Sequence, residues 1–323
     1  MQNVSLANDG AAPLGAGAAV SVDLSFEGTH EASGQLTFGA MPGGGSIAFA
    51  ALNLSVAAPP QWDAEHPRLH NLTLSLTLPG GSALSEVVSL RIGFREVEIV
   101  STNRIAINGH VIKARGTTRH DTHPIVGRSL WTLPPAGRQW ERDITLFRDA
   151  NINYIRTSHY PPAEELMEAA DELGMLIELE MPFCWASGNT GGFDFNYTVQ
   201  VWRGARSRGV ELPRSHAATE CKRSAPSTTR RPQAQREAMV FNRNHPSVIH
   251  WSLGNESPWL QNFALSLQDY LREVDSTRPF MFDGGSQQPS ERSRVSRVAS
   301  CSSVQTSIRC CSSPTQYSVC PLS

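Results

Sequence analysis

This chain of 323 residues has no excess of positive or negative charge, and it has no long apolar segment. Charged residues make up 18% of it, and 28 basic against 30 acidic residues leave a formal net charge of −2. Such a balance offers no electrostatic footprint for nucleic acid or for an anionic membrane surface. The longest apolar stretch, Ile47 to Ala58, is interrupted by Asn53 and is shorter than the ~20 residues that span a bilayer. We therefore predict no transmembrane helix, no nucleic-acid partner and no membrane partner.

The chain also contains few lysines, and its cysteines are unevenly distributed. Lys113 and Lys222 are the two lysines, so almost all of the basic residues are arginine. The first basic residue is Arg68, so the N-terminus lacks the basic start of a secretory signal, and a cytoplasmic location is expected if this N-terminus is complete. The cysteines do not form a convincing disulfide framework, because four of the 6 crowd the tail: Cys301, Cys310, Cys311 and Cys320.

Residues 1 to about 93 alternate apolar and polar side chains with a period of two. This pattern is typical of half-buried strands, and the Gly- and Pro-rich breaks between them have the spacing of an antiparallel β-sandwich. The clearest row consists of Leu72, Leu74, Leu76 and Leu78, and it ends at the turn signal Pro79-Gly80-Gly81. We find no catalytic constellation in this part of the chain.

After Gly93 a hairpin is expected at Asn108-Gly109, and short strands then alternate with helices. The alternation indicates βα units and a parallel sheet, as in a (β/α)8 barrel. We predict strands near residues 111–114, 153–156, 176–179, 248–253 and 280–282, and helices near 139–150, 162–173 and 260–274. Five candidate strands are thus recognisable before residue 284.

Polar residues follow four of the predicted strands. In a (β/α)8 barrel the carboxyl ends of the strands carry the active site, so these residues are expected to share one pocket. The clusters are Arg119, His120 and Asp121 after the first strand, His159 and Tyr160 after the second, Glu180 after the third, and Asn255 and Glu256 after the fourth.

Glu256 is the strongest catalytic candidate. A buried strand delivers it through Gly254 to the rim, where partial removal from water would suit a carboxyl group to donate a proton near neutral pH. Asn255 beside it either caps the loop or holds a substrate hydroxyl. His120 and His123 form either a polar loop or a weak H-x-x-H metal pair; we favour pocket lining for His120 and leave His123 unassigned.

Four stretches in this order resemble the catalytic part of glycoside hydrolase family 2, the group of β-galactosidases, β-glucuronidases and β-mannosidases. Together with residues 278–284 they span residues 105 to 283, and the last of the four is the most specific. Residues 62–70 similarly resemble the end of the immunoglobulin-like domain that precedes the family's barrel. The four stretches are Ile107 to Pro124, Asn153 to Pro161, Asp171 to Glu180, and Asn244-His-Pro-Ser-Val-Ile-His-Trp-Ser-Leu-Gly-Asn-Glu256.

The resemblance implies an immunoglobulin-like β-sandwich over residues 1–93 and an incomplete (β/α)8 TIM barrel over residues 94–283. It implies a retaining O-glycosyl hydrolase that cleaves β-linked hexosides and needs no cofactor. Glu256 would be the general acid/base and Asn255 its substrate-binding neighbour. His120 and His159 would line the sugar pocket, with Asp121 and Arg119 at its edge.

Two positions depart from the family pattern. Some members bind magnesium through a glutamate and a histidine after the third strand, where this chain reads Met181-Pro-Phe-Cys-Trp185, so no metal site is predicted. Trp185 either stacks on a sugar ring or packs in the core. The family nucleophile, a glutamate after the seventh strand, has no match here. A replacement nucleophile at Glu180 and a non-catalytic fragment or carbohydrate-binding protein are the alternatives to an active enzyme.

Two segments change character. Residues 203–236 hold 8 arginines and are predicted to be an irregular insertion or an aberrant segment. Residues 284–323 hold 12 serines and 4 cysteines without periodicity, and we predict a disordered or aberrant tail from a truncated or frameshifted reading frame. Neither the sugar nor the oligomeric state can be read from the sequence.

Overall fold

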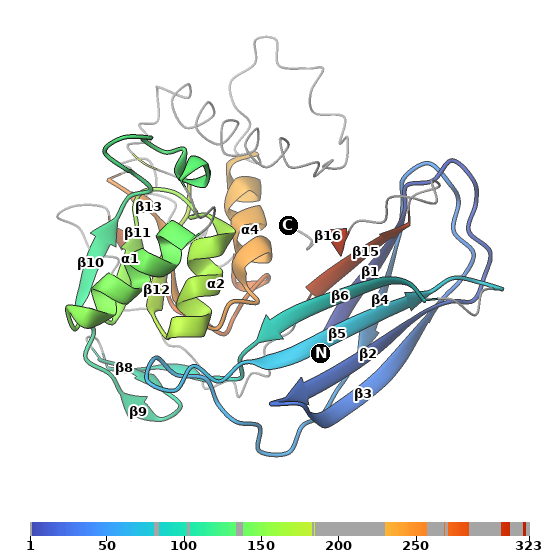
Figure 1. The fold of residues 1–323 in the computed structure, drawn as a ribbon, viewed down its shortest axis with the longest axis horizontal. Coiled ribbons are helices and arrows are strands. Elements are labelled where there is room, and N and C mark those ends of the chain that lie inside the picture. The colour runs from blue at the N-terminus through green and yellow to red at the C-terminus, as the bar shows by residue number, and fades with distance from the viewer. Residues whose placement is uncertain are drawn as a thin grey trace, which may run out of the picture. The chain divides into compact units, whose positions relative to one another are not determined.

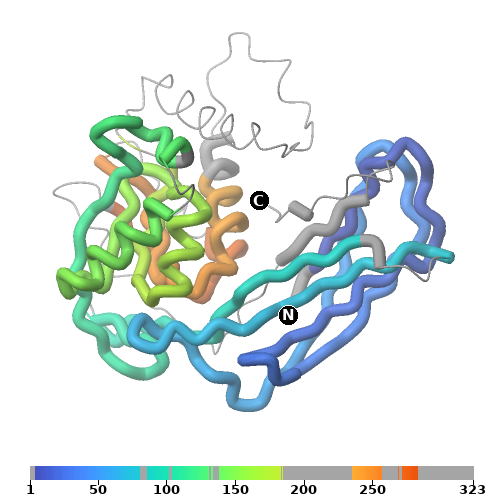
Figure 2. Tube along the Cα trace, viewed as in Figure 1, coloured from blue at the N-terminus to red at the C-terminus, as the bar shows by residue number. Residues whose placement is uncertain are grey.

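The computed structural model describes residues 2–80, 84–101, 104–133, 138–182, 184, 230–256, 268, 271–283, 305–310 and 319–320. The chain divides into two compact units (Figures 1 and 2). The first unit contains residues 1–60, 68–94 and 301–323, and the second contains residues 61–67 and 95–300. The division after Phe94 lies one residue from the boundary expected from the change in sequence pattern.

The first unit contains two four-stranded sheets that share one apolar core. One sheet has the order β3-β2-β5-β6 and is antiparallel, and the other has the order β16-β15-β1-β4. Alternate residues of β1, β2 and β5 supply the core, as the period-two pattern predicts. The strands are β1 (Gln2–Asn8), β2 (Ala18–Phe26), β3 (Thr29–Phe38), β4 (Ser46–Leu52), β5 (His70–Thr77), β6 (Leu84–Ile92), β15 (Gln305–Cys310) and β16 (Val319–Cys320).

Strands β15 and β16 differ from the prediction of a tail without regular structure. Strand β15 pairs in parallel with β1, Val4 opposite Thr306 and Leu6 opposite Ile308, and β16 pairs antiparallel with β15. The prediction used composition, which measures how much apolar surface a segment has to bury. Pairing at a sheet edge instead satisfies backbone N–H and C=O groups, which every non-proline residue carries.

The second unit begins with a small antiparallel sheet of β7 (Val97–Ser101), β8 (Arg104–Ile107) and β9 (His110–Val111). Asn108 and Gly109 connect β8 to β9 with φ values of 52° and 79°. Positive φ at both central residues is the signature of the type I′ hairpin turn that Asn-Gly favours. The predicted hairpin is therefore confirmed.

A five-stranded parallel sheet in the order β10-β11-β12-β13-β14 follows, and its strands alternate with helices along the chain (Figure 1). Four strands lie within two residues of their predicted bounds. The strands are β10 (Gly116–Arg119), β11 (Tyr154–Thr157), β12 (Leu176–Glu180), β13 (Val248–Asn255) and β14 (Phe280–Asp283), and the helical segments are η1 (Leu130–Thr132), α1 (Arg138–Asp149), α2 (Glu164–Leu173) and α4 (Arg230–Asn242).

Two details of this unit correct the sequence interpretation. The first barrel strand is the polar segment β10, because the apolar residues just before it belong to the hairpin strand β9 or follow it without regular structure. Helix α4 includes residues 230–236, which were predicted to be irregular. Residues 203–229 and most of the predicted helix 260–274 lie outside the described residues.

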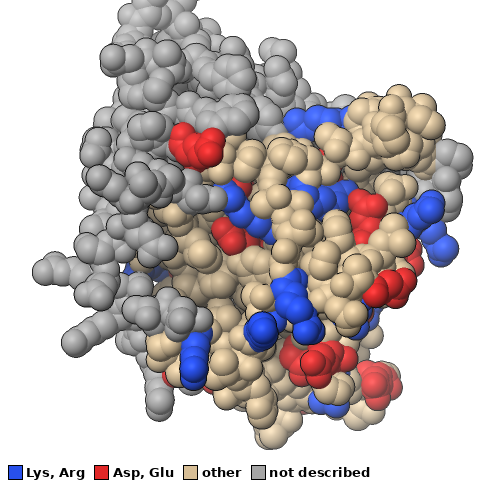
Figure 3. All heavy atoms as spheres, turned by 90° about the vertical axis from the view of Figure 1, so that its left-hand side faces the viewer, with Lys and Arg blue, Asp and Glu red and all other residues tan. Residues whose placement is uncertain are grey.

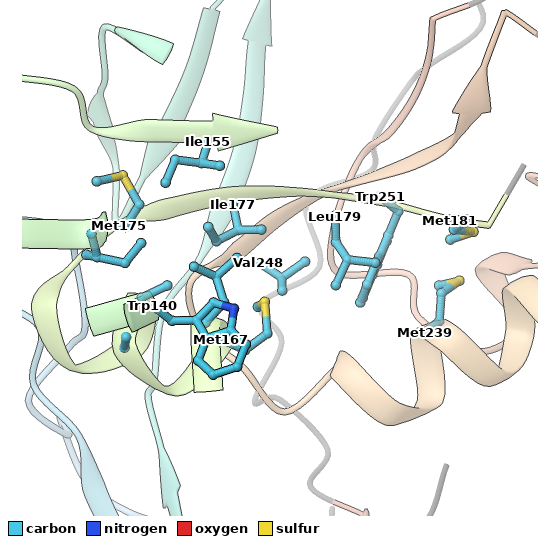
Figure 4. Packing of buried hydrophobic residues seen from close by; sticks show 14 of the residues in the cluster. Trp140, Ile155, Met167, Met175, Ile177, Leu179, Met181, Met239, Val248 and Trp251 are labelled. Atoms are coloured by element: carbon cyan, nitrogen blue, oxygen red, sulfur yellow. The ribbon is translucent and has the colours of Figure 1, made fainter. Parts of the chain in front are cut away.

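One side of the parallel sheet packs on its helices through a continuous apolar core (Figure 4). Trp140 from α1 and Met167 from α2 lie beneath Ile155 and Ile177 of the sheet, and Met239 of α4 lies near Trp251. Gly174 ends α2 in the left-handed conformation, with φ at 77°, as its position predicts. No helix within the described segments is long and apolar enough to cross a membrane.

Basic and acidic side chains are interspersed over the described atoms of the face in Figure 3. On this face they do not gather into a large patch of one sign, in agreement with the near-neutral net charge.

Candidate functional site

The face of the parallel sheet opposite its helices is polar. Side chains alternate along each strand, so the neighbours of the apolar residues that pack on α1 and α2 must point the other way. These neighbours form a hydrogen-bonded network that runs along the sheet toward the carboxyl ends of its strands. Its members are Tyr154 and Arg156 of β11, Glu178 and Glu180 of β12, and His250 of β13.

Arg156 is the centre of this network. Its Nη2 lies 2.8 Å from Oε2 of Glu180 and 3.0 Å from Oδ1 of Asn255. Its Nε lies 3.7 Å from Oε1 of Glu178. Glu180 has no exposed surface, so its charge depends on such partners rather than on water.

His159 lies at the end of the network nearest the rim. Its Nδ1 is 3.0 Å from both carboxylate oxygens of Glu180. A carboxylate paired with arginine only accepts hydrogen bonds, so Nδ1 of His159 carries the proton in this contact.

His120 follows β10, and its ring is packed edge-on against that of His159 at a centroid distance of 5.3 Å. Partial burial lowers the pKa of His120, and the neighbouring His159 and Arg128 lower it further. His120 is therefore neutral at pH 7. The structure thus brings together two of the predicted pocket histidines.

The side chains of Arg119 and Asp121 bond to each other and to other side chains of the protein. Arg119 is buried and donates to both Asp121 and Asp143, the latter from Nη2 at 2.6 Å. Burial acts to lower the pKa of Arg119, but Asp121 and Asp143 outweigh it and raise that pKa. Asp121 also accepts from Trp140 Nε1 at 3.1 Å. The pair joins the loop after β10 to α1.

Tyr160 also contacts this loop. Its hydroxyl oxygen accepts the backbone N–H of Asp121 at 2.9 Å, and burial raises the pKa of Tyr160. The guanidinium of Arg128 lies 4.0 Å above its ring. His123 belongs to a tight turn, since its backbone exchanges hydrogen bonds with Gly127 and its Nδ1 accepts from the Ile125 N–H.

Tyr154 and His250 form the deepest part of the network. The Tyr154 hydroxyl donates to Glu178 at 2.6 Å, so it must accept from Nδ1 of His250 at 2.9 Å. Burial lowers the pKa of His250 to about 4 and, together with Glu178, raises the pKa of Tyr154. Tyr154, His250 and Arg156 are not among the site residues predicted from the sequence. Their signal was the polar side chain at every second position of β11 and β12.

Strand β13 brings Asn255 and Glu256 to the rim. Gly254 has a φ of 148°, which only glycine adopts readily, and Glu256 has a left-handed φ of 42°. Asn255 is 5% exposed, and its Nδ2 lies 3.6 Å from Sγ of Cys184.

Glu256 itself is exposed, so the expected partial desolvation is wrong for the described structure. The strand ends at Asn255, and the left-handed turn at Glu256 takes this residue out of the buried sheet. Trp185 lies outside the described residues. No group of three or more His, Cys, Asp or Glu side chains within the described part of the chain could hold a metal ion.

A parallel sheet of βα units, with a polar network leading to the carboxyl ends of its strands, is consistent with part of a (β/α)8 barrel. The sequence profile for the TIM barrel domain of glycosyl hydrolases family 2 matches residues 97–310, which is more than half of the chain. The chain belongs to glycoside hydrolase family 2, as its motifs predict.

Known relatives are several times longer than this chain. It is 32% identical over 238 residues to a beta-galactosidase of Priestia megaterium, covering 72% of this chain and 20% of that protein. It is 28% identical over 235 residues to a beta-galactosidase of Kluyveromyces lactis, covering 72% of this chain and 22% of that protein. The chain therefore spans about a fifth of the length of these two relatives.

Solved structures share the fold. A beta-glucuronidase of Bacteroides uniformis matches with a TM-score of 0.64 and 22% identity over 85% of this chain and 30% of that one. A beta-glucuronidase of Parabacteroides merdae matches with a TM-score of 0.61 and 24% identity over 82% of this chain and 29% of that one.

Proposed function

We propose that this chain carries the acid/base half of a retaining β-glycosidase site that acts on β-linked hexosides. The observation that carries the proposal is the sequence Asn255-Glu256 at the carboxyl end of β13, in the same sheet whose β11 delivers His159 to the rim. Membership of glycoside hydrolase family 2 supports it, as do the names of the relatives.

In this proposal Glu256 protonates the departing glycosidic oxygen while a second carboxylate attacks the anomeric carbon from about 5 Å away. Water then displaces the sugar, and Glu256 acts as the base that takes its proton. The exposure of Glu256 gives the leaving group access to it from solvent. The rim imidazoles of His120 and His159 offer ring nitrogens to sugar hydroxyls. No cofactor takes part.

In this proposal neither buried glutamate of β12 is the second carboxylate. Glu180 has no exposed surface and is held by Arg156 and His159, and Glu178 accepts from the Tyr154 hydroxyl. A nucleophile must approach the anomeric carbon directly, which these positions do not allow. The nucleophile is therefore not assigned to Glu178 or Glu180.

Hydrolysis of nitrophenyl β-glucuronide and β-galactoside by the full chain tests the proposal. We expect Glu256→Gln to lower kcat by about 10²-fold or more, because general acid catalysis contributes that much. The matched control is Glu273→Gln, a substitution at an exposed residue that precedes β14 and is not part of the site.

Turnover that is equal in wild type and Glu256→Gln contradicts the role of Glu256. No turnover in either protein supports the alternative of a non-catalytic carbohydrate-binding chain. Intact mass measured after incubation with an activated fluorosugar shows whether any carboxylate of the chain forms the covalent intermediate.

We also infer that the two-sheet unit is the immunoglobulin-like domain of the family. Its two four-stranded sheets around one apolar core support this.

A further inference from the structure

We propose that Arg243 is the main contact of a binding site for a small oxyanion, a phosphate or a carboxylate, at the end of the parallel sheet opposite the candidate active site. Arg243 lies between helix α4 and strand β13, so it is at the amino end of β13. Asn255 and Glu256 lie at the carboxyl end of the same strand. The two sites are therefore separate, and this inference does not depend on the proposed glycosidase function.

Arg243 has an unused hydrogen-bonding edge. Its Nε and Nη2 atoms are buried, and neither has a hydrogen-bond partner in the described part of the chain. These two nitrogens form one edge of the planar guanidinium and donate in parallel, which matches two oxygens of a carboxylate or a phosphate. A buried cation without a partner is unfavourable, and burial lowers the pKa of Arg243. An anion bound at this edge would remove that penalty.

The carboxylate nearest in charge to Arg243, that of Asp275, already has its own partners. It accepts from Trp251 Nε1 at 2.8 Å and from the backbone N–H and the hydroxyl of Thr277 at 2.8 Å and 2.7 Å. It is also paired with Nη1 of Arg278. Four donors thus occupy its two oxygens, and none of these donors belongs to Arg243. Asp275 therefore does not satisfy the buried edge of Arg243.

Positive charge exceeds negative charge around Arg243. After burial, the charged groups that act on the pKa of Arg243 are Asp275, which raises it, and Arg278 and Arg236, which lower it. Arg278 is also close in space, because its Nη2 donates to the backbone carbonyl of Arg243 at 2.7 Å. The charge of Asp275 is balanced by its ion pair with Arg278. An oxyanion at the Arg243 edge would supply the missing negative charge.

The burial of this edge limits the size of the ligand. Arg243 as a whole is half-buried, so part of its side chain reaches the surface and offers an approach from solvent. Because Nε and Nη2 are themselves buried, the ligand must be small enough to reach them below the surface. This favours a free oxyanion over the surface of another macromolecule.

Titration of the full chain with sodium phosphate tests the proposal. The Nε–H signal of Arg243 in ¹⁵N NMR spectra should shift and saturate, because this N–H gains a charged acceptor. Sodium chloride at the same ionic strength should leave the signal in place. By calorimetry, Arg243→Gln should raise the Kd for phosphate about tenfold or more, which is the effect of losing one charge-assisted hydrogen bond.

Arg142→Gln is the matched control. Arg142 is an exposed arginine of α1 in the same unit, so its substitution removes the same charge away from the proposed site. The Kd for phosphate should remain within about twofold of wild type. Equal weakening in the two variants would show that phosphate responds only to net charge, and would overturn the proposal. The absence of a saturable shift in wild type would overturn it as well.

Arg243→Lys keeps the test decisive if Arg243→Gln does not fold. Lysine retains the charge but lacks the two parallel donors, so the Kd for phosphate should still rise. An unchanged Kd contradicts binding through the Nε and Nη2 edge.

Separate titrations with phosphate and acetate identify the source of the oxyanion. Both offer two oxygens to the guanidinium edge, but they differ in shape and charge. Tighter binding of phosphate indicates a phosphate ligand, and tighter binding of acetate indicates a carboxylate ligand. Binding of neither ion refutes the site, whether or not the chain hydrolyses a glycoside.

Discussion

Buried carboxyl groups of this chain differ in their hydrogen-bond and ion-pair partners. Glu180 in the barrel unit has no exposed surface, but Arg156 and His159 contact it directly. Glu86 of β6 is 7% exposed and lies opposite Leu76 on the core side of the sandwich. Neither of its carboxylate oxygens has a hydrogen-bond partner among the described residues, and burial raises the pKa of Glu86 to about 7.

Glu86 should therefore make stability depend on pH. The folded state holds the proton of Glu86 up to about pH 7, whereas the unfolded chain releases it near 4.5. The contribution of Glu86 to stability is greatest below pH 4.5 and falls as the pH rises to about 7, by at most about 3.5 kcal/mol at about 1.4 kcal/mol per pKa unit. The urea midpoint of Glu86→Gln should lack this decline.

Glu27→Gln is the control for this prediction, because Glu27 is an exposed residue of the same unit. It should leave the pH profile of the urea midpoint unchanged. A Glu86→Gln profile parallel to that of wild type would show that Glu86 is ionised in the folded state at no cost.

At the scale of elements, packing against the sheet rather than intrinsic propensity holds the helices. Helix α1 buries Trp140 and Ile144 in the barrel core and exposes Leu146. All three are large apolar residues of one short helix, but they differ in burial. Comparing substitutions of a buried and an exposed residue therefore separates the contribution of packing from that of hydrophobic character.

Ile144→Ala should destabilise the protein by about 2–5 kcal/mol, because it removes fully buried methyl and methylene groups and leaves a cavity. Leu146→Ala, on the same helix, should change stability by less than about 0.5 kcal/mol, because Leu146 is 56% exposed. Urea unfolding followed by circular dichroism measures both. Equal losses would show that α1 does not pack on the sheet as described.

At the scale of the whole molecule, the two ends of the chain meet in one sheet. Strand β1 is paired with β4 on one side and with β15 on the other. Its backbone N–H groups alternate in direction, so both sets are paired within this sheet. An edge strand has only one set paired.

Native-state hydrogen exchange should therefore protect the amides of consecutive residues from Val4 to Ala7. Strand β3, at the edge of the other sheet, should show protection only at alternate residues. Alternate protection in β1 as well would mean that β15 does not pair with it in solution.

The sequence by itself determined the apolar layers, the hairpin at Asn108-Gly109 and the order of strands and helices in the barrel unit. These features depend on local patterns: a period of two, a period near 3.6, and turn residues with positive φ. It also identified the residues at the carboxyl ends of the strands, because the end of a strand is a local feature.

Only the tertiary structure decided how polar side chains are paired. Arg156 contacts Glu180, 24 positions away, and Asn255, 99 positions away, because strand register places them side by side. The pairing of strand β15 and of the polar edge strand β10 was also decided only by the tertiary structure, because it depends on backbone groups that all residues share. Amino-acid composition does not indicate which residues become neighbours in this way.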